Sequence, residues 1–335
     1  MEAIAGEVAL LRGAFPRSAQ WGVTRDRVLQ PSWRKGIAFN PRLYPLFHAF
    51  TSVAQHAFHL NHLMGSLGDW HHLRSVSKRP VILTVALRQP PCDFTLLRKV
   101  QRFVVEWPGA RTFLMRHGVN RQDIELVYPP VDLGHFVPST KPKGPFTVLF
   151  ASSPARADWF DGRGVPIVLA AARLCPRMRF VMCWRPWGDG LTHLHGLLRR
   201  SSLPNVEVHV GRVTDMSEFY SRAHVAVFCG TDPSQCKPVP NSITEAMACG
   251  CPVVVTPVVQ IAAMVAEAEA GLVVAPDGLA LAGALEELAS SWTGPAGRAR
   301  AVAEKYFDQR RFLGAYSRIY QEALGGATSG AGREA

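Results

Sequence analysis

The chain has 335 residues, of which 47% are hydrophobic and 19% charged, and its formal net charge is +11. This length is large for one core and predicts two domains of ordinary size, while the hydrophobic content excludes a disordered chain. No window reaches the ~18 uncharged apolar residues of a membrane-spanning helix, and the N-terminus lacks the layout of a signal peptide. We therefore expect a cytoplasmic protein.

The positive charge is concentrated in the first half of the chain. Residues 1–143 hold 19 Lys and Arg against 9 Asp and Glu, whereas the remainder holds 18 against 17. The excess favours an anionic partner, for which a lipid phosphate, an acidic membrane surface and a charged acceptor are open alternatives to a merely solvated surface. Nucleic acid is disfavoured, because no nucleic-acid-binding motif accompanies the charge.

The seven cysteines and twelve histidines form no metal-binding pattern. The cysteines are odd in number and lie mostly in apolar runs, which predicts buried reduced thiols. His56, His59 and His62 recur every third residue, but no nearby carboxylate or thiol completes a standard zinc spacing. We predict no metal site and no cofactor.

The second half of the chain alternates between strand and helix patterns. Apolar β-branched and aromatic runs predict strands at Phe146–Phe150, Arg179–Cys183, Val206–Val210, His224–Phe228, Pro252–Val255 and Gly271–Val274. Helical patterns of about ten residues lie between these runs, which predicts βαβ units and a parallel doubly wound sheet. The Pro- and Lys-rich run Ser139–Pro145 predicts the linker between the domains, and residues 325–335 predict a disordered tail.

The stretch from Phe228 to Val258 carries the most information. It predicts a strand, a long loop with three prolines, a short helix and a second strand. Ser242 followed three residues later by Glu245 is a capping-box pattern, which predicts that the helix starts at Ser242. A loop that leads from the carboxyl end of a parallel strand into a helix N-terminus is a position where open α/β sheets bind anionic ligands.

Glu245–Val255, with the sequence EAMACGCPVVV, resembles the signature of family 4 retaining glycosyltransferases of the GT-B fold. The resemblance covers residues 98–324. It implies an α/β enzyme in which two Rossmann-like domains face each other across a cleft. It places the acceptor-side domain at residues 1–143, the nucleotide-sugar-binding domain at 144–308, and a helix that crosses back to the first domain at 309–324.

The first domain is expected to be abbreviated, because residues 1–55 show no opening strand followed by a glycine-rich turn. An earlier start of the true chain is the alternative. No GxGxxG follows a strand anywhere, which disfavours a nicotinamide dehydrogenase.

The resemblance also implies roles for single residues. Glu245 is expected to bind the ribose hydroxyls, and Gly211 to lie in a loop that holds the base through backbone contacts. Arg163 is expected to neutralise the donor diphosphate as a fixed cation. The other donor-binding candidates lie at strand ends or at the helix start, and they are Ser152, Ser153, Arg156, Arg185, Asn241 and Ser242.

Lys237 departs from the family pattern. The family has a glutamate eight residues before Glu245 that contacts the donor sugar, whereas a lysine accepts no hydrogen bond from sugar hydroxyls. The sequence KPVPNS is similar to a branch in which lysine replaces this glutamate. Lys237 is therefore expected to approach the diphosphate or an acidic donor sugar, and to form the catalytic set with Arg163 and Glu245.

The function implied is retaining transfer of a sugar from a nucleotide-diphosphate donor, without a metal, to a glycan, lipid-linked or small-molecule acceptor. Peripheral contact of the basic first domain with an anionic membrane is part of this interpretation. A non-catalytic nucleotide-sugar-binding regulatory or partner subunit is the alternative.

Overall fold

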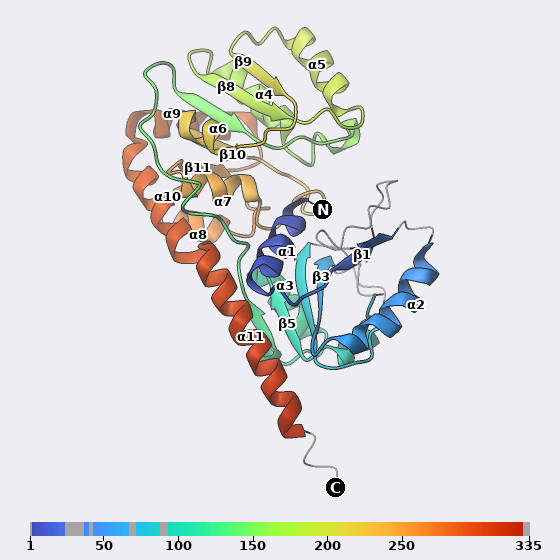
Figure 1. Cartoon of the computed structure of the whole chain (residues 1–335). Helices are drawn as coiled ribbons and strands as arrows, with labels where there is room; N and C mark the ends of the chain where they lie inside the picture. Colours follow the sequence, from blue (N-terminus) through green and yellow to red (C-terminus); the bar gives the residue numbers. More distant parts are fainter. Residues whose placement is uncertain (1, 24–36, 40–42, 67–71, 88–92, 331–335) are drawn as a thin grey trace. The chain divides into compact units, whose positions relative to one another are not determined.

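The computed structural model describes residues 2–23, 37–39, 43–66, 72–87 and 93–330, which divide into two compact units (Figure 1). Unit 1 comprises Met1–Val127 and Arg310–Ala335, and unit 2 comprises Tyr128–Gln309. The division therefore falls before the Pro- and Lys-rich run at which the sequence predicted the boundary, and the end of the chain belongs with its beginning.

Unit 1 is built on a four-stranded parallel sheet in the order β3-β4-β5-β6. Its strands are β3 (Asn61–Ser66), β4 (Val81–Leu87), β5 (Arg102–Val105) and β6 (Ile124–Leu126). A separate parallel pair joins β1 (Trp21–Val23) to β2 (Ile37–Phe39). The helices are α1 (Glu2–Ala14), α2 (Tyr44–Ala54), α3 (Pro108–Arg116) and the 3-10 turns η2 (Gln55–Ala57), η4 (Phe94–Lys99) and η5 (Arg121–Asp123).

The last helix, α11 (Gln309–Gly330), packs into the core of unit 1 (Figure 1). Its residues Phe312, Tyr316 and Ile319 are buried in a cluster that includes Ile82 of β4 and Val104 of β5. The helix continues past residue 324 to Gly330, and residues 331–335 of the predicted disordered tail lie outside the described residues. Extending a helix that is already nucleated costs little, even through small residues.

Polar contacts also fix α11 to the sheet. The hydroxyl groups of Tyr316 and Thr84 lie 2.7 Å apart, and Thr84 Oγ1 lies 2.8 Å from His62 Nε2. His62 Nδ1 in turn lies 2.7 Å from the hydroxyl oxygen of Tyr320. Burial lowers the pKa of His62 to about 3, so this imidazole is neutral. The histidine is therefore a structural link in unit 1.

Unit 2 is built on a six-stranded parallel sheet in the order β12-β11-β10-β7-β8-β9. The strands are β7 (Thr147–Phe150), β8 (Arg179–Trp184), β9 (Val206–Val210), β10 (Val225–Phe228), β11 (Val253–Val255) and β12 (Gly271–Val273). All six predicted strands are confirmed, each within one residue at either end. The three central strands β7, β10 and β11 are buried along their whole length, which is why they read as continuous apolar runs.

Helices cover both faces of this sheet. Helices α4 (Val165–Leu174), α5 (Gly190–Ser201) and α9 (Gly278–Ser291) share one apolar cluster with the strands. The other face is covered by three helices that pack with one another: α6 (Ser217–Arg222), α7 (Asn241–Ala248) and α10 (Thr293–Tyr306). Helix α8 (Ala262–Glu267) follows β11. The 3-10 turn η6 (Ala157–Trp159) precedes α4.

The strand order reverses beside β7. Successive strands are added outward from β7 through β8 to β9, and on the other side from β10 through β11 to β12. The loops that follow β7 and β10 therefore diverge at a topological switch point, which is where open α/β sheets bind ligands.

Two further observations concern the helices and the cysteines of the described residues. No helix in the part of the chain that the structure describes is long and apolar enough to cross a membrane. Six of the seven cysteines are described, and all six are free and buried, as predicted. Cys92 lies outside the described residues.

The packing of α11 can be tested by truncating side chains along it. Phe312 is 3% exposed within the core cluster, so Phe312→Ala should lower the free energy of unfolding by about 3–5 kcal/mol. Leu324 of the same helix is 38% exposed, so Leu324→Ala should change it by less than about 0.5 kcal/mol. Urea denaturation of both variants measures the difference, and equal effects would contradict the packing.

Candidate functional site

The predicted site residues lie in loops that leave the carboxyl ends of four strands of unit 2. The loop after β7 carries Ser152, Ser153, Arg156 and Arg163, the loop after β8 carries Arg185, and Gly211 follows β9. The loop after β10 carries Lys237 and leads into α7, which begins with Asn241, Ser242 and Glu245. In a parallel sheet these ends share one edge, so the loops border one region of the unit.

Arg163 is a partly buried cation on the loop after β7. Its Nη1 donates to Ser152 Oγ at 3.3 Å, while its Nε is buried without a hydrogen-bond partner among the described residues. Burial lowers the pKa of the guanidinium, although arginine remains charged at any ordinary pH. The position therefore holds a fixed positive charge with an N–H group that an anion can satisfy.

One carbonyl group couples the loop of Arg163 to the loop of Lys237. Gly162 O accepts from Thr231 N at 3.0 Å, from Asp232 N at 3.3 Å and from Cys236 Sγ at 3.4 Å. Thr231 Oγ1 also donates to Asp161 O at 2.9 Å. The two loops at the switch point are therefore held together at one contact. This contact lies next to Arg163 on one loop and next to Lys237 on the other.

Gly164 allows this close approach. Its φ is +74°, and a Cβ built there would lie 1.9 Å from Cys229 O. A side chain is therefore excluded both by conformation and by space. Gly164 is also the N-cap residue of α4, with proline in the first turn of that helix.

Glu245 lies on α7 and is bonded to a tyrosine. Tyr220 donates its hydroxyl to Glu245 Oε2 at 3.1 Å. Burial raises the pKa of Glu245 to about 7, while Tyr220, Lys237, His135 and Arg185 act in the opposite direction. The carboxyl group is thus poised between its neutral and ionised forms near neutral pH.

The helix of Glu245 starts one residue earlier than predicted. Pro240 is the N-cap residue, α7 begins at Asn241, and no side chain caps it. The capping-box prediction for Ser242 is therefore wrong, because the Glu245 carboxylate is bonded to Tyr220 across the helix packing and not to the backbone of its own first turn. Lys237 Nζ instead donates to Asn241 Oδ1 at 2.9 Å, which holds the ammonium group beside the helix start.

Arg185 and Ser153 are joined through Trp187. The Arg185 guanidinium lies 5.4 Å from the centroid of the Trp187 ring, and Trp187 Nε1 donates to Ser153 O at 2.8 Å. Gly211 has φ +140° and donates its N–H to Trp184 O at 2.9 Å. The loops after β7, β8 and β9 therefore support one another at the same edge of the sheet.

Arg156 is not brought into this group. Its guanidinium is 63% exposed and makes two hydrogen bonds of 2.8 Å to the Asp158 carboxylate. The Asp158 carboxylate raises the pKa of Arg156. The side chain is thus engaged at the surface two residues from its own position.

Two neighbours of Glu245 did not stand out in the sequence. Tyr220 is fully buried on α6, and His135 Nε2 lies 2.9 Å from Asp215 Oδ1. Both lie far from Glu245 along the chain: Tyr220 is bonded to Glu245 through the packing of α6, and His135 acts on the Glu245 carboxyl group electrostatically. The segment HVGRVTDMSEFY, which ends at Tyr220, contains Gly211 and was interpreted as the loop that holds the base. Nothing in its pattern indicated the contact between Tyr220 and Glu245.

The described residues contain no group of three His, Cys, Asp or Glu side chains that could hold a metal ion. Positive charge at this edge of the sheet is carried by Arg163, Lys237 and Arg185.

The comparison with family models falls on the same part of the chain. Residues 164–291 match the family model described as Glycosyl transferases group 1. Within this segment the chain is therefore similar to the glycosyl transferases group 1. The matched residues run from the N-cap of α4 to the end of α9, and they include Arg185, Gly211, Lys237 and Glu245.

Curated relatives agree with this similarity. D-inositol 3-phosphate glycosyltransferases of Mycobacterium tuberculosis and Mycobacterium bovis are 28% identical over 231 residues, which is 64% of this chain and 47% of the relative. The chain thus spans about half the length of the curated relatives it matches.

Solved structures of glycosyltransferases confirm the GT-B fold class. Anabaena HepE in complex with UDP has a TM-score of 0.73 at 18% identity, covering 94% of this chain and 96% of that one. Sucrose-phosphate synthase from Thermosynechococcus elongatus has a TM-score of 0.75 at 18% identity, covering 96% and 93%. A glycosyltransferase from Rickettsia africae has a TM-score of 0.76 at 13% identity, covering 96% and 94%.

The close approach at Gly164 predicts a large cost of substitution. Gly164→Ala should lower the free energy of unfolding by more than about 2 kcal/mol, because it adds left-handed strain to a backbone clash. Gly283→Ala, in the open interior of α9, is the matched control and should raise stability by up to about 1 kcal/mol. Urea denaturation distinguishes the two, and a neutral Gly164→Ala variant would refute the contact.

The raised pKa of Glu245 predicts a pH-dependent stability. Between pH 4.5 and about 7 the folded protein binds a proton that the unfolded chain has released, so stability falls as pH rises through this window. The loss is at most about 3 kcal/mol. Glu245→Gln retains an acceptor for Tyr220 but does not titrate. The variant should therefore gain stability relative to the parent protein from pH 5 to pH 8, and a constant difference would show that Glu245 has an ordinary pKa.

Proposed function

We propose that the protein is a retaining glycosyltransferase of the family 4 type that uses a nucleotide-diphosphate sugar without a metal. The observation that carries the proposal is the junction at the switch point of unit 2, where one carbonyl couples the loops of Arg163 and Lys237. The two cations and the start of α7 supply positive charge at the edge where such sheets bind phosphates.

Arg163 is proposed to hold the diphosphate. A phosphate oxygen would accept from its buried Nε–H, which has no partner among the described residues. When the bond from the sugar to the phosphate breaks, negative charge grows on the diphosphate, and a fixed guanidinium stabilises that charge. Ser152 Oγ, 3.3 Å from Arg163 Nη1, sets the orientation of the guanidinium before the donor binds.

Glu245 is proposed to hold the ribose. Its carboxylate accepts hydrogen bonds from two neighbouring hydroxyls, while Tyr220 fixes Oε2 from the protein side. Gly211 and its loop are proposed to contact the base through the backbone. Asn241 and Ser242 lie in the first turn of α7, where backbone N–H groups are free to meet a phosphate.

Lys237 is proposed to face the sugar end of the donor. Its ammonium group is held 2.9 Å from Asn241 Oδ1, which fixes the position of this positive charge beside the start of α7. This favours a diphosphate oxygen or a carboxylate on the sugar over the hydroxyl contact that a glutamate makes.

The relatives suggest where to begin with substrates. Structures of Anabaena HepE contain UDP, UDP-glucose, and UDP with glucose, so a uridine donor is the first to test. The curated relatives are named for an acceptor that bears a phosphate. An anionic glycan, lipid-linked or small-molecule acceptor suits the basic first half of this chain, and so does peripheral contact with an anionic membrane.

Turnover of the donor tests the proposal. The full chain should be stabilised by a matching nucleotide sugar in a thermal-shift panel, and should slowly release nucleoside diphosphate from it without acceptor or added metal. Arg163→Ala should slow this release by about 10²–10³-fold, because the leaving group loses its cation. Arg173→Ala, an exposed residue near the end of α4, removes the same charge away from the site and should leave the rate unchanged.

A non-catalytic partner subunit is the second candidate, and the lysine at position 237 favours it. Such a protein would bind the nucleotide sugar with a saturable thermal shift, yet release no nucleoside diphosphate with or without acceptor. Absence of binding to every nucleoside diphosphate and nucleotide sugar would refute both candidates.

A further inference from the structure

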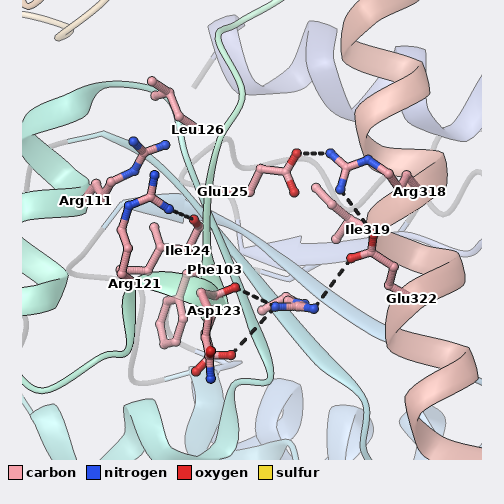
Figure 2. Close-up of a pocket in the computed structure, with 12 residues that line it drawn as sticks. Phe103, Arg111, Arg121, Asp123, Ile124, Glu125, Leu126, Arg318, Ile319 and Glu322 are labelled. Carbon is pink, nitrogen blue, oxygen red and sulfur yellow. Dashed lines mark hydrogen bonds and ion pairs between the residues drawn. The ribbon is translucent and has the colours of Figure 1, made fainter.

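A charged pocket of about 360 Å³ lies within unit 1, apart from the residues proposed to bind the donor (Figure 2). Its walls come from four places in the sequence: β5, α3, the segment from η5 through β6, and α11. The proposed function does not use it. Its volume falls in the range of sites for small organic ligands, about 300–1,000 Å³.

The carboxylates that line this pocket form ion pairs with two arginines. Arg102 lies 3.7 Å from Asp123 Oδ1 and 3.5 Å from Glu322 Oε2. Arg318 lies 3.2 Å from Glu322 Oε1 and also binds Glu125. Two arginines thus bind all three carboxylates, and Figure 2 shows the contacts of Arg318 with Glu125 and Glu322 on the side of α11.

Two more arginines lie on the other side of the pocket. Figure 2 shows the guanidinium groups of Arg111 from α3 and Arg121 from η5 close to each other there, away from Glu125 and Glu322. Arg121 Nη1 donates to Ile124 O at 3.4 Å, which is at the long end of hydrogen bonding. A guanidinium has five N–H donors and no acceptor, so this side of the pocket offers donors and positive charge.

We propose that this pocket binds a phosphorylated ligand, with the phosphate held between Arg111 and Arg121. Paired guanidinium groups match the oxygen geometry of a phosphate and bind it with charge-assisted bonds. The pocket is larger than one phosphate requires, so the rest of the ligand lies toward Arg102 and Arg318. The side chains that line the pocket include four arginines and three carboxylates, and this composition favours an anion over a cation.

The phosphate can belong to a soluble phosphorylated sugar or polyol, or to the headgroup of an anionic lipid. The first source is probed by sn-glycerol 3-phosphate, with glycerol as the control that lacks the phosphate. The second is probed by vesicles of phosphatidylglycerol in phosphatidylcholine, with pure phosphatidylcholine vesicles as the control. Calorimetry with the full chain measures the first, and co-sedimentation measures the second.

Variants of the pocket decide whether binding occurs there. Arg111→Gln and Arg121→Gln should each weaken binding about tenfold or more in whichever arm shows saturation, because each removes a charge-assisted contact. Arg116→Gln is the matched control, since it removes the same charge from the exposed end of α3, outside the pocket. Arg111→Lys keeps the charge but not the forked geometry, and should also weaken binding.

Saturable binding of sn-glycerol 3-phosphate supports a soluble ligand, and saturable binding of anionic vesicles alone supports a lipid headgroup. The proposal is overturned if neither probe saturates, or if Arg116→Gln weakens binding as much as the pocket variants do. Circular dichroism checks folding; Arg121 is exposed, so Arg121→Gln keeps the test valid even if Arg111→Gln unfolds. Donor binding by unit 2 is measured separately, so the two proposals fail independently.

Discussion

The candidate site depends on the carbonyl group of Gly162. Three donors from the loop after β10 converge on this single oxygen, and the residues that carry charge stand directly beside the contact, at positions 163 and 237. Ordering the loop of twelve residues between β10 and α7 has a large entropic cost, and these contacts offset part of it. Because Gly164 has no side chain, the two loops approach closely enough for the contact to form.

Much of unit 2 was predictable from the sequence, and the reason is physical. Its central strands are buried on both faces, so each had to be a continuous apolar run bounded by polar loops. The start of α7 was mispredicted because the Ser242 and Glu245 pattern satisfies a local rule, whereas Glu245 is bonded to Tyr220 through tertiary packing. Local patterns predict which segments form elements, but not which polar side chains meet between them.

Unit 1 was harder to predict for the same reason. Its last helix comes from the far end of the chain, so its core is assembled by long-range contacts. The basic excess was visible in the composition, but the pocket was not. The arginines that line it come from four separate elements, and only folding brings them to one cavity. They are Arg102, Arg111, Arg121 and Arg318.

The electrostatics of the candidate site link the protonation of Glu245 to the binding of a charged ligand beside it. Nearby cations, among them Lys237 and Arg185, favour the ionised form of Glu245, while burial opposes it and leaves the pKa at about 7. An arriving diphosphate would be neutralised by these same cations and would weaken their effect on the carboxylate. Donor binding and protonation of Glu245 are then linked: a diphosphate raises the pKa of Glu245, and hydrogen bonds from ribose hydroxyls lower it again. We therefore expect a nucleoside diphosphate to bind with less proton uptake than inorganic diphosphate does, which calorimetry in buffers of different ionisation enthalpy can measure.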